Sequence, residues 1–184
     1  MTPIEEALAG ITAFFDELSI PYMLIGGLAM AAWGEPRATL DVDLSVWIEP
    51  DRQESTLTRV FRSFHALPQD PFRFASETRV CPLLSSNGVR IDVVLGVLPF
   101  ERDAIARART LAIGGRSVRV ASVEDLLLMK LVSERPRDRE DAERLLRRFG
   151  GTLDREYLMP LLENLADALG RPEIARLTGE PPRD

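Results

Sequence analysis

Residue types that commonly build catalytic centres are scarce in this sequence. Its 184 residues include one cysteine, Cys81, and one histidine, His65. No intramolecular disulfide can form, and a zinc site built from several cysteines or from a histidine pair is excluded. Any catalysis must therefore rest on carboxylates, arginine, lysine, hydroxyl groups and backbone amides.

Lysine is as scarce as cysteine. Of the 23 basic residues, all but Lys130 are arginine. Such a bias is typical of the base composition of a gene, so a lysine that persists against it suggests a specific role.

Long apolar runs are also missing. No stretch reaches the roughly 18 to 20 apolar residues of a membrane span, and Glu5 and Glu6 stand where a signal peptide would be basic. The net charge of −6 argues against indiscriminate binding of nucleic acid. We expect a soluble cytoplasmic protein without a membrane partner.

The order of predicted elements indicates an α+β fold with a mixed or antiparallel sheet flanked by helices. We expect a core over residues 1–120 and a helical region over residues 121–184 packed on it. Strands are predicted over residues 22–25, 41–48, 79–84, 89–95, 110–113 and 117–120. Helices are predicted over residues 3–18, 28–33, 51–65, 101–109, 123–133, 138–149, 154–169 and 172–177.

The strand over residues 41–48 carries an unexpected pair of charges. Val42, Leu44, Val46 and Ile48 alternate with Asp41 and Asp43, so both carboxylates project from one face. Two ionised carboxylates so close repel each other unless a cation neutralises them. They line either a solvated edge strand or a site for a hard cation such as Mg²⁺.

A third carboxylate, Asp92, lies in the apolar strand over residues 89–95. If this strand pairs beside the strand over residues 41–48, three acids converge and form a platform for two metal ions. The alternative is an edge residue paired with Arg90 or Arg79.

The two strands of the hairpin over residues 79–95 are joined by Asn87-Gly88, which predicts a tight turn with two positive φ angles.

Gly26-Gly27 follows the apolar strand over residues 22–25. Glycines between a strand and a helix let the backbone approach a ligand closely, and amides at a helix start favour phosphate oxygens. Glycines serve ordinary turns as well, so the value of this pair comes from its position before Asp41 and Asp43.

Together these residues resemble a known signature. Gly26-Gly27, then Arg37-Ala-Thr39-Leu-Asp41-Val-Asp43, then Ile91-Asp92-Val93 is similar to the polymerase-β-like nucleotidyltransferase superfamily. The Arg-x-Thr-x-Asp-x-Asp form resembles its AbiEii/AbiGii-type branch, which includes toxins of type IV toxin–antitoxin systems and the mycobacterial MenT toxins. The resemblance covers roughly residues 22 to 95.

The C-terminal part resembles the same branch, whose members carry a lysine followed by aspartates on the next helix. Lys130, Asp138 and Asp141 match that pattern. Lys130 also lies on the apolar face of its predicted helix, where an unpaired ammonium is costly. It pairs either with a nucleotide phosphate or, structurally, with Asp138 or Asp141, unless it extends to solvent. The resemblance favours Asp141 over Asp138 as a site residue.

The resemblance implies transfer of a nucleoside monophosphate from an NTP to a hydroxyl group. Two Mg²⁺ ions would bind Asp41, Asp43 and Asp92, and Asp92 would hold the catalytic ion or act as general base. Gly26, Gly27 and Thr39 would belong to the nucleotide site, with Arg37 and Lys130 facing phosphate charge. Thr39 fits equally a role in orienting the loop before the strand.

The acceptor is left open by these residues. A tRNA end or a protein hydroxyl fits a toxin, which would also have a cognate antitoxin as partner. A small-molecule acceptor fits the aminoglycoside-modifying relatives, and a non-catalytic nucleotide-binding protein is a third possibility, against which the presence of all three acids argues.

Overall fold

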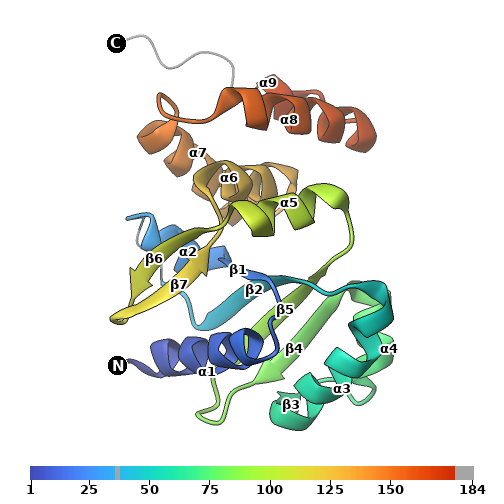
Figure 1. Ribbon diagram of the computed structural model, residues 1–184. Coiled ribbons are helices and arrows are strands. Elements are labelled where there is room, and N and C mark those ends of the chain that lie inside the picture. The colour runs from blue at the N-terminus through green and yellow to red at the C-terminus, as the bar shows by residue number, and fades with distance from the viewer. Residues whose placement is uncertain (36–37, 177–184) are drawn as a thin grey trace. The chain divides into compact units, whose positions relative to one another are not determined.

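A seven-stranded mixed sheet organises the N-terminal part of the protein in a computed structural model that describes residues 1–35 and 38–176 (Figure 1). Its strands are β1 Tyr22–Ile25, β2 Asp41–Trp47, β3 His65–Ala66, β4 Val80–Leu84, β5 Arg90–Gly96, β6 Arg109–Ile113 and β7 Arg116–Val120. They follow the order β3-β4-β5-β2-β1-β7-β6. Strand β2 is parallel to β5 and β1 to β7, whereas the other neighbours are antiparallel. The predicted α+β class is confirmed.

The centre of the sheet is the pair β2 and β5. Val42, Leu44 and Val46 are fully buried on one face of β2, as the alternation predicts. The parallel register places Asp43 opposite Asp92. Because β4 pairs with the other side of β5, Asp92 lies on an inner strand. The predicted pairing of the two acid-bearing strands is thus confirmed.

Helices surround this sheet. In the N-terminal part they are α1 Pro3–Glu17, α2 Gly26–Ala32, α3 Gln53–Ser63, α4 Pro71–Thr78 and α5 Pro99–Arg107, with a 3-10 turn, η1, at Pro50–Arg52. Helix α1 packs on β2, and its Leu8, Ile11 and Phe15 are buried. Its start is closed by a capping box, in which the Thr2 hydroxyl accepts from the Glu5 backbone and the Glu5 carboxylate accepts from the Thr2 backbone.

The segment between β2 and β4 differs from the prediction. The expected helix over residues 51–65 forms as the shorter α3, preceded by η1, and the chain is extended at Phe64 (φ −127°, ψ 145°). His65–Ala66 then pairs with β4, so a tertiary contact overrides the local helical pattern. Helix α4 was not predicted either, although Asp70 caps it through the Arg73 backbone and Pro71 occupies its first position.

The turn between β4 and β5 also differs in detail. Gly88 has a positive φ of 81°, but Asn87 does not, so the prediction of two positive φ angles was wrong here. The Gly88 backbone donates to the Ser85 carbonyl at 3.0 Å instead. The expected conformation occurs in the β6–β7 hairpin, where Gly114 and Gly115 have φ angles of 57° and 77°.

The chain divides into two compact units, Met1–Ala121 and Ser122–Asp184. The second contains four helices over its described residues: α6 Val123–Val132, α7 Pro136–Phe149, α8 Arg155–Leu169 and α9 Glu173–Arg176. Ser122 caps α6 through the Asp125 backbone, as predicted. Residue 177 of the predicted last helix lies outside the described residues. Across residues 1–35 and 38–176, no helix is long and apolar enough to span a membrane.

Candidate active site

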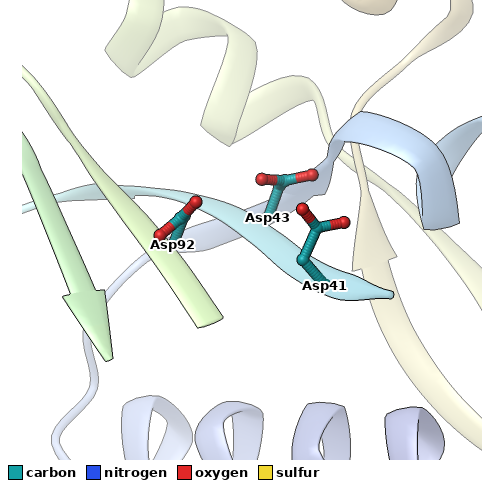
Figure 2. Close-up of side chains that lie close together, drawn as sticks. All are labelled: Asp41, Asp43 and Asp92. Carbon is teal, nitrogen blue, oxygen red and sulfur yellow. The ribbon is translucent and has the colours of Figure 1, made fainter. Parts of the chain in front are cut away.

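Three carboxylates gather on one face at the centre of the sheet. Asp41 and Asp43 project from β2 and Asp92 from β5, and Figure 2 shows them on the same side of both strands. One carboxylate oxygen of each lies within 4.8 Å of the others. All three residues are half-buried. The predicted convergence of these acids is what the structure shows.

The chemistry of this donor set suits a hard divalent cation. Mg²⁺ takes oxygen ligands and is commonly bound through one or two carboxylates together with substrate phosphates. Three half-buried acids drawn together on the two central strands meet that requirement. The arrangement can therefore hold a cation and leave some of its coordination positions to a substrate.

Gly26 makes room for Asp43. It has a φ of 67°, and a Cβ at this position would overlap the Asp43 carboxylate. Both the backbone conformation and the close approach require glycine. Gly26 therefore belongs to the immediate surroundings of the acids, because the Asp43 carboxylate occupies the space that a side chain at Gly26 would fill.

Thr39 orients Asp41. Its hydroxyl donates to Asp41 Oδ1 at 2.6 Å. A Cβ on Gly27 would lie 2.8 Å from the Thr39 Cβ, so this second glycine makes room for the threonine. The structure thus brings Gly26, Gly27 and Thr39 together with the acids. Arg37, the other predicted residue of this segment, lies outside the described residues.

Arg90 is a member of this group that was considered only as a structural partner. Its Nε donates to Asp92 Oδ1 at 3.0 Å and to Oδ2 at 3.1 Å. The hydrogen bond with Asp92 raises the pKa of Arg90, and the charges of Asp41 and Asp43 add to the effect. Arg79, the other partner considered for Asp92, pairs with Glu101 instead. The signal for Arg90 was its spacing of two from Asp92, which places both on one face.

The remaining predicted residues lie in the second unit, at the junction of α6 and α7. Lys130 Nζ lies 2.5 Å from Asp138 Oδ1 and 3.0 Å from Asp141 Oδ2. All three residues are buried. The structural ion pair considered for Lys130 is therefore present, and it includes both aspartates.

Asp138 accepts hydrogen bonds from Lys130, Ser133 and Arg135. Burial alone would raise its pKa, but hydrogen bonds from Lys130 and Ser133 and the charge of Arg135 lower the pKa below its ordinary value. Lys130 also lines an open hollow of about 290 Å³ within this unit. An ammonium has three donors, so the two carboxylates leave capacity for a further acceptor.

A family match decides the assignment. Residues 3–169 match the family described as nucleotidyltransferases of unknown function (DUF6036). The chain belongs to this family. A comparison with curated proteins gave no match.

Solved nucleotidyltransferase structures share the fold. The solution structure of the antibiotic-resistance factor ANT(2'')-Ia is 20% identical over 94% of this chain and 93% of that chain, with a TM-score of 0.56. A nucleotidyltransferase-like protein from Paracoccidioides brasiliensis is 21% identical over 95% of this chain and 91% of its own, with a TM-score of 0.51. The lincosamide adenylyltransferase LnuA, bound to lincomycin, is 13% identical over 77% and 95%, with a TM-score of 0.50.

These matches confirm the nucleotidyltransferase superfamily and its fold. At such low identities the structural likeness extends to the fold alone. Membership of the AbiEii/AbiGii-type branch stays a prediction.

Proposed function

We propose that this nucleotidyltransferase transfers a nucleoside monophosphate from an NTP to a hydroxyl acceptor in a Mg²⁺-dependent reaction. The observation that carries the proposal is the convergence of Asp41, Asp43 and Asp92 within 4.8 Å on the central strands of a chain from this family. Like charges at this separation are costly without a cation, so a function for the cluster explains its presence better than chance does.

Each acid has a distinct part in the proposal. Asp41 and Asp43 would hold the metal, with two ions in the full complex, and Thr39 keeps the Asp41 carboxylate oriented. Asp92, from β5, would hold the catalytic ion or receive the proton of the acceptor hydroxyl. When bound, Mg²⁺ neutralises phosphate charge and lowers the pKa of the attacking hydroxyl.

The nucleotide site is proposed to include the backbone of Gly26 and Gly27, where the missing side chains leave the chain open beside Asp43. From the resemblance, Arg37, Lys130 and Asp141 also belong to the catalytic and nucleotide-binding residues. These assignments remain part of the proposal. Because Lys130 is paired with Asp138 and Asp141, a substitution of Lys130 affects both the structural ion pair and the proposed binding of phosphate.

For the acceptor we propose a macromolecular hydroxyl, on tRNA or on a protein, as expected of a toxin with a cognate antitoxin. The Arg-x-Thr-x-Asp-x-Asp pattern at residues 37–43 is the feature that favours this branch. A small-molecule acceptor is the second candidate, because ANT(2'')-Ia and LnuA, which modify antibiotics, share the fold.

The acceptor class is tested by following two labels. The protein is incubated with Mg²⁺, total RNA, cell extract and aminoglycosides in separate reactions, with each NTP labelled at either the α- or the γ-phosphate. Nucleotidyl transfer puts the α-label, and not the γ-label, on the acceptor. Labelled RNA or protein supports the toxin proposal, whereas labelled antibiotic alone overturns it in favour of the second candidate.

The matched variants are Asp41→Asn and Asp43→Asn, which remove charge but keep shape. Asp51→Asn, at an exposed position in η1, is the control. Transfer that continues unchanged in the first two variants would overturn the assignment of the site.

A further inference from the structure

Arg90 binds the acid of the cluster that comes from β5. Its Nε donates to both Asp92 oxygens, at 3.0 and 3.1 Å. Whichever of these oxygens faces Asp41 and Asp43 therefore already accepts a hydrogen bond from a cation. A metal ion that approaches that oxygen is repelled by the guanidinium of Arg90, which is bonded to it.

The position of Arg90 follows from the strand register. It lies two residues before Asp92, on the same face of β5, and its backbone partner on β2 is Asp41. Three carboxylates that converge within 4.8 Å repel one another. Arg90 places one positive charge on this crowded face of the sheet.

We propose that Arg90 acts as a counter-cation within the Asp41–Asp43–Asp92 cluster: it pairs with Asp92 in the metal-free protein and releases this carboxylate when a divalent cation binds. This inference rests on the proposed function, because it takes the cluster to be the metal site.

The exposure of the pair makes such a release feasible. The Arg90 side chain is 53% exposed, whereas that of Asp92 is 19% exposed. Exposed ion pairs contribute little stability, so the guanidinium can swing into solvent at small cost. A divalent cation gains from three carboxylates at once, and it repels a guanidinium on the same oxygens. Arg90 therefore lowers the affinity of the cluster for metal.

The test is a calorimetric titration of Mn²⁺ into wild-type protein, Arg90→Gln and Arg73→Gln. Arg73 is the matched control, since its Nε also bonds a carboxylate, that of Glu77, at 2.8 Å on an exposed helix. We expect Arg90→Gln to bind Mn²⁺ about two- to five-fold more tightly, the range expected for loss of an exposed pair. Arg73→Gln should match the wild type, and Arg90→Lys, which keeps the charge, should lie between.

Thermal unfolding supplies a second readout. In the presence of a chelator, Arg90→Gln should melt below the wild type by about 2 °C, and this deficit should vanish at saturating Mn²⁺. Weaker Mn²⁺ binding by Arg90→Gln would overturn the proposal, because Arg90 would then hold Asp92 in place for the metal. Unchanged binding would overturn it as well, as would the absence of Mn²⁺ binding by both proteins.

The two proposals fail in different ways. If Arg90→Gln binds Mn²⁺ more tightly but the wild type transfers no nucleotide, the proposed function is wrong and the role of Arg90 stands. If transfer occurs but the Mn²⁺ affinity of Arg90→Gln is unchanged, the reverse holds.

Discussion

At the scale of single residues, the candidate site depends on a side chain that is missing. Gly26 leaves the space that the Asp43 carboxylate fills, and its φ of 67° disfavours any other residue. Gly26→Ala should therefore displace Asp43 and reduce transfer by about 100-fold, the cost of a misplaced catalytic group. Steady-state rates measure this effect.

Gly115→Ala is the matched control for Gly26→Ala. Gly115 has a similar φ of 77°, but a Cβ there meets open space. Its unfolding free energy should fall by roughly 1 to 2 kcal/mol from backbone strain, with transfer unaffected. Equal activity in the two variants would show that Gly26 serves the turn alone.

Thr39 carries a second prediction at this scale. Thr39→Val keeps the shape of the side chain but removes the hydroxyl that donates to Asp41. Loss of such an orienting bond should reduce activity or metal affinity by about 10- to 100-fold. Thr58→Val, which removes a hydroxyl that donates to the Glu54 carbonyl in an exposed part of α3, should change neither property. Wild-type turnover in Thr39→Val would remove Thr39 from the site.

The three acids could be predicted from the sequence, because each interrupts an apolar strand pattern. The orientation of their partners could not be. The spacing of two put Arg90 and Asp92 on one face and made their pairing one of the alternatives. The rotamers by which the Arg90 guanidinium and the Thr39 hydroxyl reach the acids depend on the neighbouring strands. The fit of Gly26 against Asp43 likewise depends on the β1–β2 register, in which Ile25 faces Asp43.

At the scale of elements, strong periodicity was a better guide than weak periodicity. Strand β2 and helix α1 follow clear patterns and lie where predicted, within one residue at their ends. Strand β3 is two residues long and exists because it pairs with β4, which local sequence does not reveal. Helix α4 exposes Phe72 and Phe74, so its apolar residues do not form the buried stripe that marks a helix.

The pairing of α6 with α7 yields a prediction about stability. Lys130→Met leaves Asp138 and Asp141 buried without their ammonium partner. Breaking a buried pair in this way should lower the unfolding free energy by about 3 to 5 kcal/mol. Denaturant unfolding measures the loss, and adding Asp138→Asn and Asp141→Asn should restore much of it. Full stability of Lys130→Met alone would contradict the structural role of the pair.

The same pair predicts a pH dependence. The pKa of Asp138 is lowered from 3.8 in the folded protein, so the unfolded chain binds its proton more readily. The stability contributed by this carboxylate is thus present above about pH 4 and is lost as the pH falls through the lowered pKa. Unfolding free energies between pH 2 and 6 should fall less steeply for Asp138→Asn. An identical slope in both proteins would contradict the pKa direction.

At the scale of the whole molecule, the single cysteine, Cys81, can be used to follow unfolding. Cys81 is buried in β4 of the first unit, and burial raises its pKa to about 12, so its thiol should react slowly in the folded protein. Its labelling rate therefore reports opening of that unit. Mg²⁺ at 100 times its dissociation constant should slow labelling about 100-fold where labelling requires unfolding. In Asp43→Asn this protection should be lost, and equal protection would place the metal elsewhere.

The central claim is metal-dependent nucleotidyl transfer at the Asp41–Asp43–Asp92 cluster. Its most direct test measures pyrophosphate release from an NTP in the presence of the fraction that becomes labelled in the acceptor experiment. The release is compared with and without Mg²⁺, in wild-type protein and in Asp43→Asn. We predict release in the wild type that requires Mg²⁺ and falls at least about 100-fold in Asp43→Asn, as for loss of a ligand to the catalytic metal. Release that proceeds without a divalent cation, or equally in Asp43→Asn, would contradict the claim.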